Sequence, residues 1–70
     1  MKEWKPGMIA KYDRDGQLAL LIEFDKNDLK YPGKVWICYL LTDSEYDSWK
    51  RGDIRGVKID HNWSVYNVKN

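Results

Sequence analysis

Hydrophobic and polar positions alternate along the chain in short stretches that are separated by turn residues. Pro6-Gly7 opens the first stretch, and Asp13-Arg14-Asp15-Gly16 separates it from the second. Alternation with a period of two is typical of β-strands, and proline, aspartate and glycine at the breaks favour turns. The pattern predicts strands over residues 8–12, 17–25, 34–42, 57–60 and 63–68.

The segment 42–52 is compatible with two local structures. Thr42 and Glu45 match a capping box, and Gly52 suits the end of a short helix. The polar residues between them are poor helix formers in mid-helix positions, so a loop with a strand around Trp49 is the alternative.

Short strands at this spacing predict an all-β fold, a small barrel of five to six strands with room for one short helix. The chain has 70 residues, which corresponds to one domain over 1–70. The single cysteine cannot form an internal disulfide, so packing alone must hold the fold. Aromatic residues make up 14% of the chain, and we expect most of them to be buried for that reason.

Four segments resemble the strands of SH3-like barrels. Pro6-Gly7-Met8-Ile9-Ala10-Lys11-Tyr12 resembles their first strand, and residues 20–25, 35–39 and 63–68 are similar to their second, third and closing strands. The pattern as a whole is similar to small SH3-like proteins of tailed bacteriophages. This resemblance implies a non-catalytic accessory protein that acts on a host protein in the host cytoplasm, or a minor assembly component. The chain lacks the proline-recognition motif of signalling SH3 domains.

The sequence offers little chemistry for catalysis or for a cofactor. Cys38 lies among apolar strand residues, where a thiol is usually inert, and His61 lies in a predicted turn. One cysteine and one histidine do not make a usual zinc set, and the glycines are scattered. We therefore expect no enzyme, no metal site and no cofactor. No apolar run approaches the length of a membrane span, and the first residues lack a signal peptide's apolar stretch, which favours a cytoplasmic protein.

The stretch 35–41 is apolar on both of its faces. Period-two alternation places Trp36, Cys38 and Leu40 on one face and the remaining residues on the other. A small barrel has one interior, so the second face needs a cover. Tyr46, Trp49 or Trp4 is expected to fold over it within the chain.

The alternative interpretation is that this second face binds a protein partner or a second copy of the chain. Trp and Tyr dominate the energetics of protein interfaces, and this hypothesis leaves the face partly exposed. The candidate protein-binding residues are Trp36, Leu40, Leu21, Tyr46 and Trp49.

Nucleic-acid binding is the second candidate function. Small barrels bind single strands with basic loops and stacking aromatics, and two predicted loops carry cations. Acidic residues are interleaved with them, and the net charge is only +1, so a protein partner is favoured over nucleic acid. The candidate nucleic-acid-binding residues are Lys26, Lys30, Tyr31 and Lys34 in one loop, and Lys50, Arg51 and Arg55 in the other.

Overall fold

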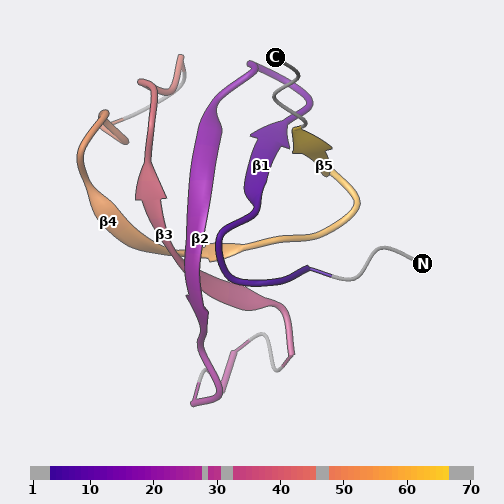
Figure 1. Ribbon diagram of the computed structural model, residues 1–70. Coiled ribbons are helices and arrows are strands. Elements are labelled where there is room, and N and C mark those ends of the chain that lie inside the picture. The colour runs from indigo at the N-terminus through magenta and orange to yellow at the C-terminus, as the bar shows by residue number, and fades with distance from the viewer. Residues whose placement is uncertain (1–3, 28, 31–32, 46–47, 67–70) are drawn as a thin grey trace.

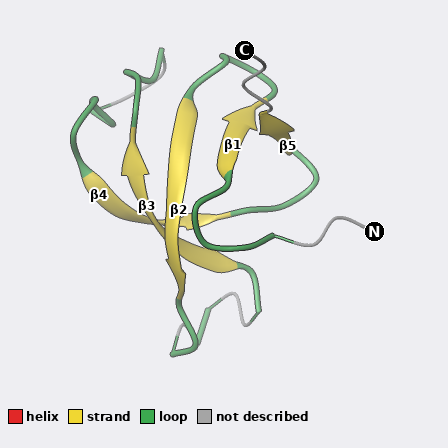
Figure 2. Cartoon of the chain, viewed as in Figure 1, coloured by secondary structure: helices red, strands yellow, loops and turns green. Residues whose placement is uncertain are grey.

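The computed structural model describes residues 4–27, 29–30, 33–45 and 48–66. In this part of the chain five antiparallel strands form one sheet and there is no helix, which confirms the predicted all-β class (Figure 2). The strands are β1 (Ile9–Tyr12), β2 (Leu18–Phe24), β3 (Val35–Leu40), β4 (Ile54–Lys58) and β5 (Trp63–Tyr66). Within the described ranges, no helix has the length and apolar character needed to cross a membrane.

The strands follow the order β4-β3-β2-β1-β5 in the sheet (Figure 1). The first four form a meander in which each strand pairs with the next, and β5 returns to pair with β1. The turn after β1 is tight: the Gly16 amide donates to the Tyr12 carbonyl at 2.8 Å, and Gly16 has a φ of 79°. This conformation favours glycine because a Cβ would be strained there. No ladder joins β4 to β5 among the described residues, so these two strands are the edges of the sheet.

The core lies on one face of the sheet. Alternate residues of the neighbouring strands point into it, and Ala10, Ala19, Cys38 and Leu40 are completely buried. The full cluster comprises Ala10, Ala19, Leu21, Trp36, Cys38, Leu40, Val57, Ile59 and Trp63.

A β-bulge in β2 changes which residues of that strand face the core. Leu21 is in register with Cys38, and Glu23 is in register with Ile37, so Ile22 is an extra residue without a partner on β3. One inserted residue reverses the alternation beyond it. The simple alternation places Ile22 and Phe24 on one face, and it is wrong here because the bulge turns Phe24 back toward the core.

β4 begins earlier than the sequence pattern predicts. Arg55-Gly56 has the composition of a turn, yet Gly56 lies within the strand in register with Ile37. A Cβ at Gly56 would lie 3.4 Å from Cγ1 of Val35, so the neighbouring strand leaves little room for a side chain. Glycine thus serves close packing at this position and does not break the strand.

The segment 42–52 forms a loop in its described residues, which excludes the helical alternative for 42–45 and 48–52. The Ser44 amide donates to the Trp49 carbonyl at 2.9 Å, and the Gly52 amide donates to the Leu40 carbonyl at 2.8 Å. No strand includes Trp49. Tyr46 lies outside the described residues.

The face that was expected to need a cover is the core itself. Trp36 is 8% exposed, Leu21 is 1% exposed and Leu40 is fully buried, so the prediction that these three form an exposed contact is wrong. The side chains of Trp4 and Trp49 pack against this cluster, which confirms the expectation that they fold over this face within the chain. Trp36, Cys38 and Leu40 fill the single interior. On the other face of β3, Tyr39 is exposed and Ile37 is half-buried, whereas Val35 is buried.

Candidate binding groove

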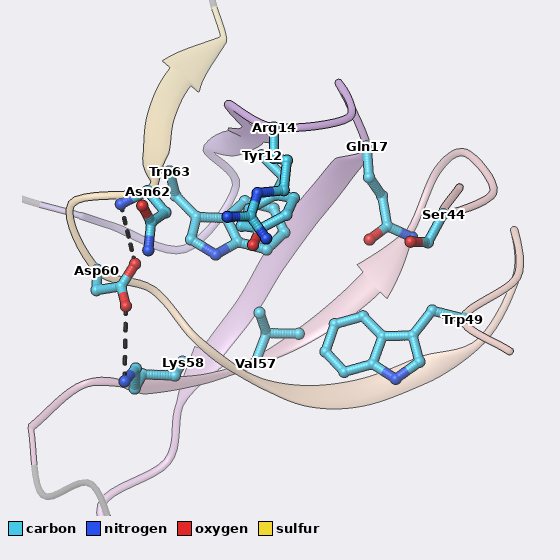
Figure 3. Close-up of a pocket in the computed structure, with 10 residues that line it drawn as sticks. All are labelled: Tyr12, Arg14, Gln17, Ser44, Trp49, Val57, Lys58, Asp60, Asn62 and Trp63. Atoms are coloured by element: carbon cyan, nitrogen blue, oxygen red, sulfur yellow. Dashed lines mark hydrogen bonds and ion pairs between the residues drawn. The ribbon is translucent and has the colours of Figure 1, made fainter. Parts of the chain in front are cut away.

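An open groove of about 420 Å³ lies between the ends of β1 and β5 on one side and β4 with the 44–49 loop on the other (Figure 3). We call it the aromatic groove because three aromatic side chains line it. Its lining residues come from five separate parts of the chain, and they are Tyr12, Arg14, Gln17, Ser44, Trp49, Val57, Lys58, Asp60, Asn62 and Trp63.

Tyr12 and Trp63 form one wall of the groove. They are opposite each other in the ladder between β1 and β5, and their ring centroids lie 5.0 Å apart at an interplanar angle of 44°. Trp63 is buried and belongs to the core, whereas Tyr12 is half-buried. Such a pair stabilises the strand ladder and presents flat apolar surface to the groove.

Trp49 forms the opposite wall, and Val57 lies between the two walls (Figure 3). The Trp49 ring packs against the core, and the guanidinium carbon of Arg55 lies 5.4 Å from its centroid. Arg55 also pairs with Asp53, 3.4 Å away. A cation over the face of a tryptophan is attracted by the ring quadrupole, so Arg55 helps to hold this wall.

Asp15 holds the loop that contains Trp49 against the β1–β2 turn through hydrogen bonds. Its carboxylate accepts hydrogen bonds from the Gln17 amide at 2.9 Å, the Ser44 hydroxyl at 2.9 Å and the Glu45 amide at 3.2 Å. Burial alone would raise the pKa of Asp15, but these hydrogen bonds to its charged form outweigh burial and lower it. The groove therefore has a preformed shape at neutral pH.

Gln17 is the one buried polar side chain of the described residues, with 3% of its surface exposed. Its Nε2 donates to the Thr42 carbonyl at 3.2 Å, which joins β2 to the loop after β3. Within the described ranges, no hydrogen bond reaches its side-chain carbonyl oxygen, and the amide points toward the groove (Figure 3). Arg55 Nε is the one buried side-chain atom without a partner among the described residues, so the Gln17 oxygen is open to solvent at the groove and can accept a hydrogen bond from a ligand.

The charged residues of the groove are two cations and one anion. Lys58 and Asp60 lie 3.6 Å apart, whereas Arg14 is exposed and has no ion pair in the part of the chain that the structure describes. The pKa of Asp60 is raised by burial but lowered more by the Asn62 amide and by the charges of Lys58 and His61, so it stays ionised. The groove thus offers one uncompensated positive charge at Arg14.

Neither Cys38 nor His61 lines the aromatic groove. Burial raises the pKa of the Cys38 thiol to about 12, so it is protonated at neutral pH and a poor nucleophile. His61 lies in the exposed turn between β4 and β5. No group of metal-ligating side chains occurs among the residues described.

The two cationic loops of the nucleic-acid hypothesis lie at opposite ends of β3 (Figure 1). Lys26, Lys30 and Lys34 precede that strand or begin it, and Lys50 and Arg51 follow it; all five are exposed. Six residues of strand separate the loops, which is about 20 Å. The fold therefore does not gather these cations into one patch. Tyr31 lies outside the described residues.

Of the residues expected to bind a partner, Trp49 is the one that the structure places in the groove. The other groove residues are not apparent from local sequence, because β5 pairs with β1 at long range and β4 lies across the groove from them without pairing to either. One signal existed: Tyr12 and Trp63 are large aromatics at strand ends, next to turns, where a side chain can be half-exposed.

Comparisons with known proteins give no relative from which a function could be transferred: no family model, no curated protein and no solved structure matches the chain.

Proposed function

We propose that this protein is a non-catalytic binding module that takes a segment of another protein into the aromatic groove. The observation that carries the proposal is the Gln17 side chain between the aromatic walls. Its Nε2 is held by the Thr42 carbonyl, and its carbonyl oxygen has no partner in the described residues and is open to solvent. Ligand sites are typically apolar hollows with a few placed polar groups, and this groove has that composition.

The walls favour an apolar or aromatic side chain of the ligand. Tyr12, Trp49 and Trp63 supply flat surface, and aromatic pairs contribute about 0.5–1.5 kcal/mol beyond their area burial. Gln17 would accept a backbone N–H of the same segment, which fixes its orientation. A folded surface without an extended or projecting segment would not reach this oxygen.

The charge at Arg14 favours an acidic residue beside the apolar one. A carboxylate can form two parallel hydrogen bonds with a guanidinium group, which gives geometric selectivity as well as attraction. The proposed ligand is therefore an acidic peptide segment with an apolar or aromatic anchor.

The finer assignment of the fold belongs to the same proposal. The order β4-β3-β2-β1-β5, with the last strand returning beside the first, supports an SH3-like barrel. The resemblance to small phage proteins suggests that the ligand is a host protein, or an assembly partner, in the host cytoplasm.

The proposal can be tested with a phage-displayed library of random peptides. We expect enriched peptides to share an aromatic or large apolar residue next to an acidic one. Synthetic peptides are then titrated against the full chain by fluorescence anisotropy. Trp49→Ala and Arg14→Glu should each weaken binding about tenfold or more, a loss of about 1.4 kcal/mol.

Two variants serve as matched controls. Trp4 also packs against the core but does not line the groove, so Trp4→Ala should leave binding unchanged in the folded protein. Lys26→Glu reverses an exposed charge in the distant β2–β3 loop and should also have no effect. Failure to enrich any peptide, or binding that survives both groove variants, would contradict the proposal. Oligonucleotide binding with a steep salt dependence would favour the nucleic-acid function instead.

A further inference from the structure

The outer face of the sheet carries a continuous apolar row that crosses all five strands. Tyr66 is in register with Ile9, Ile9 with Leu20, Leu20 with Tyr39, and Tyr39 with Ile54. Directly opposite residues in antiparallel strands lie about 4.5–5.5 Å apart, so their side chains form one band. We call this band the outer row.

Three members of the outer row are exposed to solvent, Ile9 and Leu20 are half-buried, and the row is separate from the core. Ile54 is 64% exposed, Tyr39 is 39% and Tyr66 is 38%. No member of the row belongs to the core cluster, because alternation points them away from it. Contiguous apolar surface of this kind marks an interaction site in small soluble proteins.

Two charged residues flank the outer row on opposite sides. Lys11 lies on β1, two residues beyond the row member Ile9. Glu23 lies on β2 at the level of Ile37, which is two residues before the row member Tyr39 on β3. Each is about 7 Å from the row along its strand. Neither has an ion pair within the described ranges, so both charges are available to a partner.

We infer that the outer row is an interface between two copies of this chain. A two-fold axis that runs along the row places each residue of the row opposite the same residue of the other copy, as in an isologous dimer. The same rotation exchanges the two flanks. It places Glu23 of one copy opposite Lys11 of the other, offset by about one strand spacing, 4.8 Å, along the row, and the two long side chains span the about 10 Å between the facing sheets. Two equivalent Lys11–Glu23 pairs then border an apolar contact. This inference does not depend on the aromatic groove, which opens on the other face of the sheet.

The interface is small, so the dimer is weak. Five apolar side chains and two charged ones on each copy are fewer than the about 20 residues a side of a standard interface. We expect a dissociation constant of about 0.1–1 mM for the dimer.

Sedimentation of the full chain over a range of concentrations tests the inference. The sedimentation coefficient should rise with concentration toward that of a dimer, and Ile54→Lys should keep the protein monomeric. Leu29→Lys is the matched control, because Leu29 is an apolar residue that is 95% exposed but lies in the β2–β3 loop outside the row. It should dimerise like the unsubstituted chain.

A charge exchange tests the proposed symmetry. Lys11→Glu and Glu23→Lys should each weaken dimerisation about five- to tenfold, because each creates two like-charge contacts. The double variant should restore it. A chain that remains monomeric at every concentration overturns the inference, as does a dimer that survives Ile54→Lys or a double variant without recovery.

Discussion

Phe24 and Trp36 meet edge to face across the β2–β3 ladder, with ring centroids 5.4 Å apart and an interplanar angle of 67°. The contact exists because the bulge at Ile22 turns Phe24 toward the core. Aromatic pairs in this geometry are favourable because the positive edge of one ring faces the negative face of the other.

The bulge predicts different stabilities for two truncations that simple alternation would treat alike. Phe24→Ala should lower the free energy of unfolding by about 2–4 kcal/mol, because it removes a ring that packs on the core. Ile22→Ala should cost less than about 1 kcal/mol, because Ile22 is 42% exposed. Urea unfolding followed by circular dichroism measures both. Equal losses would contradict the observed register.

This region also shows how far the sequence could be interpreted on its own. The alternation over 17–25 identified the strand, and the turn residues placed its ends within one residue of β2. The bulge depends on how β2 pairs with β3, which no local pattern contains, and a shift of one residue reverses every side chain beyond it. The prediction that Trp36, Leu21 and Leu40 form an exposed contact failed for a different reason: alternation groups residues by face but does not say which face is the interior.

The candidate site was harder to predict than the fold. Trp49 was recognised from its residue type, but Tyr12, Gln17 and Trp63 lie in the groove only because β5 pairs with β1 and the loop after β3 folds against the β1–β2 turn. The sequence pattern predicts Gln17 only as the first residue of a strand. Its burial follows from contacts with residues 25 positions away.

Asp15 should stabilise the fold above its ordinary pKa and lose that effect as the pH falls. Its pKa is lower in the folded chain than in the unfolded one, so the unfolded state binds the proton more readily and acid favours unfolding. At neutral pH, Asp15→Asn should lower the free energy of unfolding by about 1 kcal/mol, because two of its three donors are only partly shielded from water. The deficit should shrink as the pH falls below the ordinary pKa of 3.8 and disappear below the lowered pKa of the folded chain, where the carboxyl is protonated in both states.

Glu45→Gln is the control for this measurement. Its carboxylate is exposed and has no hydrogen bond or ion pair in the described part of the chain, so the substitution should be neutral at both pH values. Chemical unfolding of the three proteins at neutral and acid pH makes the comparison. A deficit of Asp15→Asn that grows with acidity would contradict the prediction.

Cys38 should be unreactive in the folded chain and should make it less stable at alkaline pH. Burial raises the pKa of the thiol from 9.0 to about 12, so the unfolded chain loses this proton first. Stability should therefore be unaffected below about pH 9 and decline above it. Thiol titration with a disulfide reagent should be slow in buffer and fast in urea. Cys38→Ala should lack this part of the alkaline decline, and a rapid reaction in buffer would contradict the assignment.

Arg55 makes favourable and unfavourable contributions of similar size to the stability of the fold. Its Nε is buried and has no hydrogen-bond partner among the described atoms, which is unfavourable by about 1–3 kcal/mol. The contact with Trp49 and the half-exposed pair with Asp53 are favourable, by about 0.5–1 kcal/mol and 0–1 kcal/mol respectively.

We therefore expect Arg55→Met to change the free energy of unfolding by no more than about 1 kcal/mol in either direction, because the methionine stem still covers the Trp49 ring. Urea unfolding measures this difference, with the exposed Arg51→Met as reference. A loss above about 2 kcal/mol would mean that the cation holds the groove wall more strongly than its contacts indicate.

The return of β5 to the side of β1 has a consequence for the order of folding. The hairpins of the meander join neighbouring segments, so they can form while later residues are still being synthesised. The ladder between Ile9 and Tyr66 joins residues near opposite ends of the described chain, and it must wait until the last strand has left the ribosome. Trp63 is part of β5 and completes one wall of the groove. A nascent chain that ends before β5 therefore lacks a complete groove and would not bind a ligand before synthesis is finished.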